Sequence, residues 1–305
     1  MAKLRRNHGG GKRGSAASAG TITKVGIFGA ILAALMYVFQ QYFSEAAPPV
    51  DQRIDYAGED YFLPGGGMQG EVVRHQGYTL SYVEEYEQAE WVAYILEREK
   101  LQQKWTERDD SFRADPAVST GSADGYDYRG SGYDRGHLAP FADFAYDAQL
   151  ANETFYMSNV SPQDRAFNQG IWRELEETTR DWAKRFKRLY VVTGPVLTLE
   201  PDQYIGRNNR VAIPKAYYKV LLDLDDPERK GIGFVIPNEL SSERLSSYAM
   251  SIDEVEAMTE LDFFAELMPE DEEGAVESVA SVDLWPLSKK KYDRRTKQWN
   301  NVNNR

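Results

Sequence analysis

The sequence contains no cysteine and only three histidines. The absence of cysteine excludes disulfide bonds, cysteine-ligated zinc, iron–sulfur clusters and thiol catalysis. A folded domain of this composition must therefore be stable without covalent cross-links. The rest of the composition is that of an ordinary globular protein, because 42% of the residues are hydrophobic and 28% are charged. A chain of 305 residues is long enough for one large domain or two small ones.

Positive charge is also scarce, with 36 basic residues against 48 acidic residues and a net charge of −12. Six of the basic residues lie in residues 1–43, which contain no acid, so the remainder has 30 basic and 48 acidic residues. This balance argues against a protein that coats nucleic acid through bulk electrostatics. An enzyme that acts on a polyanion could still work through a local basic cleft.

The longest uncharged run covers the 20 residues 25–44, about the length that a membrane-spanning helix needs. Residues 1–24 are basic and are predicted to form a cytoplasmic leader, followed by a transmembrane signal anchor at residues 25–43. Tyr37, Tyr42 and Phe43 fit interfacial aromatics and favour the anchor. The alternatives are a signal peptide cleaved near Ala46, which would release a secreted protein, and a buried soluble helix.

The remaining chain divides into a linker, a domain and a tail. Residues 44–70 are rich in proline and glycine and predict a linker, residues 71–285 the folded domain, and residues 286–305 a basic tail. The end of the tail, residues 289–305, is predicted to fray. Residues 253–277 hold eleven acidic and no basic residues, which predicts a solvated face with an exposed loop at residues 269–274.

Hydrophobic patterns predict several strands and two helices. The expected strands are residues 78–83, 189–193, 216–223 and 233–236. Apolar residues at helical spacing predict a helix over residues 168–187, and Ser251-Ile-Asp-Glu254 predicts a capping box that starts a second helix. Residues 87–100 fit either a helix or an irregular segment.

One histidine lies in a chemically suggestive context. His137 belongs to Tyr133-Asp-Arg-Gly-His-Leu-Ala-Pro140, which is no regular amphipathic face, and Asn168 and Glu176 follow within about 40 residues. Oxygen ligands suit Mg²⁺, and a neutral imidazole can take a proton from an attacking water, so the pattern indicates metal-assisted hydrolysis. Read alone, Asn168 could instead be a helix N-cap and Glu176 a solvated helix acid.

These residues belong to a larger pattern. Asp134-Arg-Gly-His137 resembles the signature of the DNA/RNA non-specific endonucleases (endonuclease G and Serratia-type nucleases), whose site is a ββα-metal, or His-Me finger, unit. Ser158-Asn-Val-Ser-Pro-Gln163 and Asn168-Gln-Gly-Ile-Trp172 follow at the family's spacing, with Glu176 eight residues after Asn168. Further similar segments are residues 214–220, 234–238, 251–256 and 261–264, so the resemblance covers roughly residues 75–268.

The resemblance implies a role for each matching residue. His137 would be the general base, and Asn168 the direct protein ligand of Mg²⁺, for which Mn²⁺ could substitute. Glu176 would hold metal-bound water. The helical rise puts it about 12 Å along from Asn168, which argues against direct ligation of one ion by both residues and fits a contact through water. Asn159 would order the site around the histidine, and Arg135 would support phosphate binding or site geometry.

The family's upstream phosphate-binding arginine has two candidates here. Both lie in Glu107-Arg-Asp-Asp-Ser-Phe-Arg-Ala-Asp-Pro116, where Arg108 is preferred and Arg113 is the rival. A guanidinium suits a phosphate because it donates two parallel hydrogen bonds. The alternative interpretation of Arg108 is a surface arginine paired with Asp109 or Asp110.

The implied fold is α+β, with a mixed, mainly antiparallel central sheet flanked by helices. The implied function is a metal-dependent, sugar-non-specific endonuclease that hydrolyses phosphodiester bonds of single- and double-stranded DNA and RNA. Two alternatives are a non-catalytic envelope module of the same fold that binds a polyanion or a protein, and a phosphodiesterase with another substrate.

The resemblance also bears on assembly and location. Family members are often dimers, so a homodimer is one expectation. The anchor predicts a single-pass membrane protein with its catalytic domain on the non-cytoplasmic side. The bacterial periplasm is the preferred compartment, and the mitochondrial intermembrane space is the second.

Overall fold

The computed structural model describes residues 61–225 and 227–300. The predicted membrane anchor at residues 25–43 and the cleavage site near Ala46 lie outside these residues. Within the described ranges, no helix is both long enough and apolar enough to span a bilayer.

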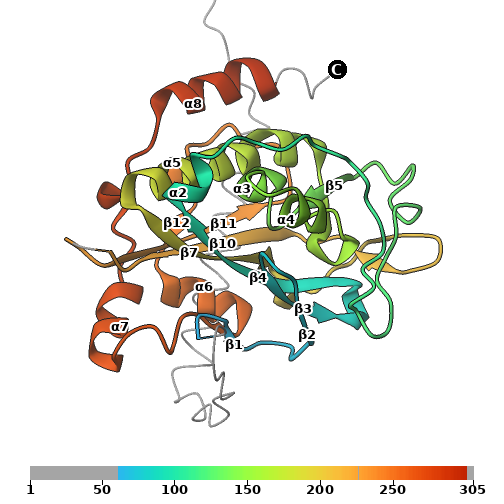
Figure 1. The fold of residues 1–305 in the computed structure, drawn as a ribbon, viewed down its shortest axis with the longest axis horizontal. Coiled ribbons are helices and arrows are strands. Elements are labelled where there is room, and N and C mark those ends of the chain that lie inside the picture. The colour runs from blue at the N-terminus through green and yellow to red at the C-terminus, as the bar shows by residue number, and fades with distance from the viewer. Residues whose placement is uncertain (1–60, 226, 301–305) are drawn as a thin grey trace, which may run out of the picture. The chain divides into compact units, whose positions relative to one another are not determined.

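A seven-stranded sheet forms the centre of the fold, with the strand order β12-β11-β10-β7-β4-β3-β2 (Figure 1). Its strands are β2 (Glu71–Arg74), β3 (Thr79–Val83), β4 (Gln88–Glu97), β7 (Arg188–Pro195), β10 (Ala216–Asp223), β11 (Lys230–Pro237) and β12 (Ala249–Met250). Every neighbouring pair is antiparallel. The α+β class and the mainly antiparallel sheet are therefore confirmed, but the expected parallel component is absent from this sheet.

Three short strand pairs lie outside the central sheet. They are β1 (Gly65–Gly66) with β13 (Leu261–Asp262), β5 (Asp134–His137) with β6 (Val160–Gln163), and β8 (Tyr204–Ile205) with β9 (Val211–Ala212). The α-helices are α2 (Arg98–Leu101), α3 (Phe141–Phe144), α4 (Ala148–Glu153), α5 (Arg173–Phe186), α6 (Ile252–Thr259), α7 (Glu270–Glu277) and α8 (Lys289–Arg294). Short 3-10 turns are η1 (Glu84–Tyr86), η2 (Met157–Asn159), η4 (Leu197–Leu199), η5 (Leu245–Ser247) and η6 (Val282–Leu284), and π-helical segments are η3 (Phe167–Trp172) and η7 (Arg295–Trp299).

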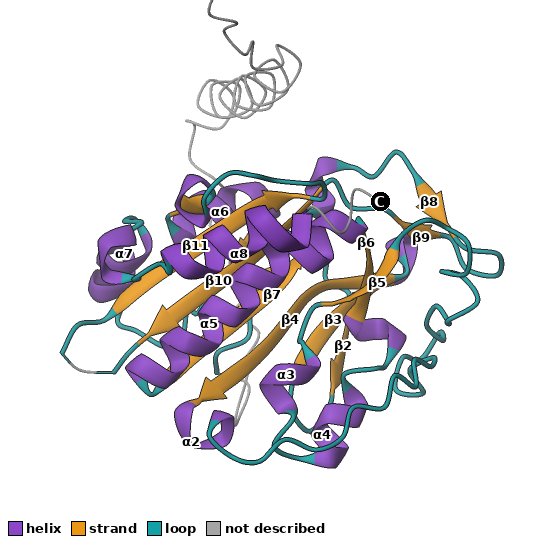
Figure 2. Cartoon of the chain, turned by 90° about the horizontal axis from the view of Figure 1, so that it is seen from above, coloured by secondary structure: helices purple, strands orange, loops and turns teal. Residues whose placement is uncertain are grey.

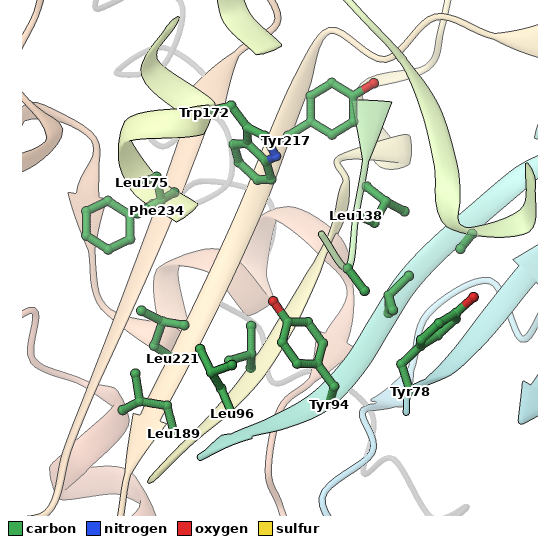
Figure 3. Close-up of a cluster of buried hydrophobic side chains, with 14 of the residues drawn as sticks. Tyr78, Tyr94, Leu96, Leu138, Trp172, Leu175, Leu189, Tyr217, Leu221 and Phe234 are labelled. Carbon is green, nitrogen blue, oxygen red and sulfur yellow. The ribbon is translucent and has the colours of Figure 1, made fainter. Parts of the chain in front are cut away.

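Helices cover both faces of the central sheet, with α5 on one face and α6 and α7 on the other (Figures 1 and 2). Successive side chains of a strand point to opposite faces. In β10, Leu221 packs in the cluster that contains Leu175 of α5, which Figure 3 shows. Its neighbours Val220 and Leu222 pack in the cluster that contains Ile252 of α6. The two clusters form the core that fixes α5, and hence the segment before it, against the sheet.

The segment at residues 87–100 differs from its prediction. It forms the ten-residue strand β4 and the short helix α2, and not a long helix or an irregular stretch. Val92 and Tyr94 pack in one cluster while Trp91 and Ala93 pack in the other. A strand buried on both faces shows no alternation of hydrophobic and polar residues, which is why its period was not visible in the sequence.

Part of the expected linker at residues 44–70 packs on the domain. Leu63 is only 5% exposed, and β1 pairs with β13. The backbone N–H of Gly67 also donates to the carbonyl oxygen of Glu260 at 2.8 Å. The described chain is therefore already part of the fold before residue 71.

The two charged C-terminal segments are also more ordered than predicted. Residues 270–277 form helix α7, so the prediction of a loop at residues 269–274 was wrong. The prediction of a frayed end from residue 289 was wrong for residues 289–299, which form α8 and η7. Arg295 is fully buried there and bonds Glu174 of α5 at 2.5 Å. This buried ion pair fixes α8 and η7 to the core.

Candidate active site

The signature motif forms strand β5, which pairs with β6 in an antiparallel register that sets His137 opposite Val160. The segment η3–α5 follows β6, so two strands and a helix carry the predicted site residues. Gly136 lies against the side chain of Gln163, whose Cδ would be only 2.1 Å from an added Cβ. Glycine at this position leaves room for the Gln163 side chain to pack on β5.

Two aromatic rings pack against His137, which is partly buried. The centroids of Phe112 and Phe155 lie 5.3 Å and 5.0 Å from that of the imidazole. Burial and the nearby Arg108 and Arg135 guanidinium groups lower the pKa of His137 to about 3. Its Nε2 is buried and has no hydrogen-bond partner. At neutral pH the ring is uncharged, which is the state that a general base requires.

Asn159 orders the chain on either side of the histidine. Its Oδ1 accepts from the backbone N–H of Ala139 at 2.9 Å, and its Nδ2 donates to the carbonyl oxygens of Ala139 and Thr154. Its own backbone carbonyl accepts from Leu138, the residue after His137. Asn159 is fully buried and contacts the backbone next to His137, as a residue that positions it would.

Asn168 lies within η3 and is not the N-cap of a helix. Asp164 takes that role, because its Oδ1 accepts from the backbone N–H groups of Ala166 and Phe167 at 2.7 Å and 3.2 Å. The alternative interpretation of Asn168 as a helix N-cap is therefore wrong. Gly170 has φ −106° and ψ −108° and interrupts the helical backbone. Such π-type irregularities occur often at functional sites.

Asp134 is a site residue that the sequence interpretation did not single out, although it begins the signature. Its Oδ2 accepts from Asn168 Nδ2 at 3.1 Å and from Gln169 Nε2 at 3.0 Å, and its Oδ1 lies 3.5 Å from Arg165 Nε. These contacts tie η3 directly to the strand that carries His137. The first letter of the motif was the available signal.

The two candidate phosphate-binding arginines differ in their partners. Arg113 donates to the carbonyl oxygens of Ser111 and Asn152 and, at 2.6 Å, to Asn152 Oδ1, and its guanidinium lies 4.1 Å from the Tyr156 ring centroid. Arg108 is half exposed and forms an ion pair with Asp110 at 2.7 Å. Arg113 is thus held by hydrogen bonds within the fold, whereas Arg108 pairs with an aspartate that is itself exposed to solvent.

A cavity of about 830 Å³ lies beside these elements. His137 does not line it, but its neighbours Arg108, Phe112 and Arg135 do, together with Asn168. The charged lining residues are Arg108, Arg113, Arg129, Arg135, Arg165, Asp110, Asp124 and Asp134. Five arginines against three aspartates make this cavity locally basic within an acidic protein, which suits a polyanionic ligand.

Glu176 is placed differently from the other predicted residues. It is not among the residues that line the cavity. Burial raises its pKa to about 7, against the opposing effect of Arg180 and Lys219. Arg180 in turn pairs with Asp143 at 2.7 Å. The structure thus brings His137, Asn159, Asn168, Arg108 and Arg135 around one region and places Glu176 in an ionic network under α5.

Known proteins share this sequence and fold. The family model of the DNA/RNA non-specific endonucleases matches residues 62–270. The mitochondrial nuclease EXOG of Mus musculus is 32% identical over 284 residues, which are 86% of this chain and 75% of that protein. The mitochondrial endonuclease G of Homo sapiens is 37% identical over 172 residues, covering 53% of this chain and 57% of that protein. A crystal structure of the EndoG/EndoGI complex has 31% identity and a TM-score of 0.60, covering 68% of this chain and 89% of the matched chain. The chain belongs to the DNA/RNA non-specific endonuclease family.

Proposed function

We propose that this nuclease cleaves DNA and RNA endonucleolytically, without sugar or sequence preference, with His137 as general base and a Mg²⁺ ion bound at Asn168. The observation that carries the proposal is an uncharged imidazole with an unpartnered Nε2, surrounded by residues of an arginine-lined cavity that also contains Asn168. Family membership supports the activity on nucleic acids.

The residues at the cavity fit a hard divalent cation. The amide oxygen is the atom with which Asn168 would bind it, and the Asn168 amide nitrogen is held by Asp134. Mg²⁺ prefers oxygen ligands and keeps several waters, so one amide in a roomy polar cavity suits it. When bound, the cation would offset negative charge on the scissile phosphate and on the leaving oxygen. We propose that Glu176 contributes through metal-bound water, as its spacing from Asn168 implies, and that Mn²⁺ can replace Mg²⁺.

The proton transfer follows from the state of His137. Nε2 takes a proton from a water molecule, the water oxygen forms a bond to phosphorus, and the phosphodiester bond to the leaving oxygen breaks. Nε2 is shielded from solvent in this structure, so substrate binding must open a path for the water. Asn159 acts as a positioning residue, because its amide bonds fix the backbone after His137.

Arg108 and Arg135 supply positive charge beside the base. Both lower the pKa of His137, which places their guanidinium groups within electrostatic reach of the ring. We propose that Arg108 binds the scissile phosphate, exchanging its exposed partner Asp110 for the substrate. Arg135, whose guanidinium lies 4.4 Å from the Phe112 ring centroid, would support phosphate binding from the other side of the motif.

The lack of base specificity has a physical reason. Contacts to phosphate and metal carry no information about base sequence. The charged groups of the cavity are suited to the backbone of a nucleic acid and not to the edges of its bases. Single- and double-stranded DNA and RNA are therefore all proposed substrates.

The test is a cleavage assay with the full-length chain on plasmid DNA and on RNA, with Mg²⁺, Mn²⁺ or EDTA. We expect degradation of both substrates with either ion and none with EDTA. His137→Ala should abolish cleavage while the protein keeps its circular dichroism spectrum. Full activity of His137→Ala would refute the mechanism. Tight, salt-sensitive DNA binding without cleavage under any divalent ion would instead support the non-catalytic alternative.

The location of the protein stays a proposal. We propose that residues 25–43 anchor the chain in a membrane with the nuclease domain on the non-cytoplasmic side. The two relatives described above are named mitochondrial, which supports a mitochondrial location as an option besides the bacterial periplasm. Alkaline carbonate extraction combined with protease protection would test this, and release of the protein by carbonate would contradict the anchor. The homodimer also stays a prediction, for sedimentation analysis to test.

A further inference from the structure

Three carboxylates converge on the face of the sheet opposite α5, far along the chain from the signature motif. Asp253 and Glu256 lie on α6, and Glu277 lies at the end of α7. One oxygen atom from each of the three side chains lies within 4.8 Å of those of the others. Figure 1 shows α6 and α7 together below the central sheet, while α5 lies above it.

Glu277 carries a buried oxygen atom without a hydrogen-bond partner. Glu277 is only 5% exposed, and the unpartnered atom is its Oε1. A buried carboxylate oxygen without a partner is costly. Glu256, by comparison, is held in place because its Oε1 accepts from the backbone N–H of Phe263 at 2.7 Å. A buried carboxylate with an unpaired oxygen atom beside two further acids fits a cation ligand.

The backbone explains why two helices meet closely enough to form this cluster. Gly231 of β11 has no side chain, and an added Cβ would lie 2.5 Å from Ile252 of α6 and 3.5 Å from Val276 of α7. Gly233 similarly lies under Val255 of α6. Glycine at these positions lets both helices rest on the strand, which brings Glu277 to α6.

The cluster belongs to a strongly acidic segment, because residues 253–277 hold eleven acidic residues. Residues 253–277 contain no lysine or arginine. Glu272 of this segment forms an ion pair with Arg229, outside the cluster.

We propose that Asp253, Glu256 and Glu277 form a Ca²⁺ site that joins α6 to α7. Calcium takes about 6–8 oxygen ligands, carboxylates among them, whereas Mg²⁺ is usually held by one or two carboxylates. Three carboxylate oxygen atoms that all lie within 4.8 Å of one another can reach a single Ca²⁺ ion. Asp253 is exposed, which gives the ion a path from solvent, and water would complete the coordination.

The experiment is calorimetric titration of CaCl₂ into chelator-treated full-length protein carrying Asn168→Ala, which removes the proposed catalytic cation. We expect one Ca²⁺ bound per chain. Adding Glu277→Gln or Asp253→Asn should weaken binding at least about tenfold, because each removes one charged ligand. The matched control is Glu266→Gln, which removes the same charge from an exposed position of the same segment and should bind Ca²⁺ unchanged.

Thermal unfolding provides an independent readout. Ca²⁺ should raise the melting temperature of the Glu266→Gln protein and leave that of the Glu277→Gln protein unchanged, because binding to the folded state stabilises it. The exposed Asp253→Asn change keeps the test valid if the buried Glu277→Gln change impairs folding. Absence of Ca²⁺ binding in the Asn168→Ala protein, unchanged binding in both ligand variants, or equal affinity for Mg²⁺ would overturn the proposal.

Discussion

At the scale of single residues, the properties of His137 come from its enclosure. Phe112 and Phe155 shield part of the ring from water, Nε2 is buried, and two arginines add positive charge nearby. Both effects disfavour the imidazolium ion, so the pKa falls to about 3. The imidazole therefore stays neutral over the physiological pH range. The same lowered pKa should reduce the stability of the fold in acid.

His137 should make the fold sensitive to acid. Because its pKa is lower in the folded state than the usual value near 6.5, the unfolded chain binds the proton more readily, and stability falls as pH drops from about 6.5 toward 3. In the His137→Gln protein this contribution is absent. Between pH 7 and pH 5, wild type should lose up to about 2 kcal/mol more unfolding free energy than the variant. Urea denaturation of both proteins in EDTA measures this, and parallel pH profiles would contradict it.

Arg108 and Arg113 should separate activity from stability. Arg108→Ala should lower kcat/KM on DNA by about 100-fold, because a charged hydrogen bond to phosphate contributes about 1.5–3 kcal/mol, while its unfolding free energy changes little. Arg113→Ala should cost about 1–3 kcal/mol of stability, because Asn152 loses its partner. Cleavage kinetics and denaturant titration of both variants test the assignment. A larger activity loss in folded Arg113→Ala than in Arg108→Ala would reverse it.

At the scale of elements, the segment η3 decides where Asn168 lies. Asp164 caps it, Asp134 holds Asn168 and Gln169, and Gly170 departs from helical geometry before α5 begins. If residues 168–186 formed one regular helix, the direction of the Asn168 side chain would be fixed by the way α5 packs on the sheet. The π-helical segment instead places Asn168 at the cavity while α5 keeps its own apolar face on the sheet.

Loss of the Asp164 cap should therefore affect the site as well as stability. Asp164→Ala removes the hydrogen bonds from the backbone N–H groups of Ala166 and Phe167, at the start of η3, and should cost about 1 kcal/mol. It should also weaken Mg²⁺ binding and so raise the Mg²⁺ concentration that gives half-maximal cleavage. The control is Ser251→Ala, which removes the cap of α6 on the other face and should cost a similar amount with unchanged metal dependence. Equal metal responses in both variants would contradict the positioning role of Asp164.

At the scale of the whole domain, the C-terminal segment at residues 295–300 packs against α5 and η3, which lead to the candidate site. Arg295 bonds Glu174 of α5 and the carbonyl oxygens of Ser241 and Glu243. Asn300 Oδ1 lies 3.1 Å from where a Cβ on Gly170 would be, so the end of the described chain packs on η3. Residues more than 100 positions apart thus hold the segment that contains Asn168.

Breaking this ion pair should destabilise the domain strongly. Arg295→Met leaves the Glu174 carboxylate buried without its cation, which costs about 3–5 kcal/mol. The double change Glu174→Leu/Arg295→Met should recover a large part of that loss, because it removes both charges. Thermal unfolding of the single and double variants measures the coupling. A double variant as unstable as the single Arg295→Met protein would show that the carbonyl bonds of Arg295, and not the charge pair, matter most.

Local sequence was sufficient where one short segment contains the whole signal. The strand at residues 216–223 and the capping box at Ser251 were predictable, because their hydrophobic runs and polar caps are read over a few residues. The signature around His137, with the spacing to Asn168, was also sufficient to predict the family and the candidate base.

Other features depended on contacts between distant segments. The strand β4 is buried on both faces, so only its neighbours β3 and β7 decide that residues 88–97 are extended. The order of the basic C-terminal segment comes from Glu174, 121 positions away from Arg295, and nothing near Arg295 in the sequence indicates it. The sequence by itself thus determined which groups can act on a phosphodiester, through residue types at fixed spacing. The tertiary structure alone decided the lowered pKa of His137, the bond from Asp134 to Asn168 and the place of Glu176, because burial and charge proximity arise only when distant segments pack together.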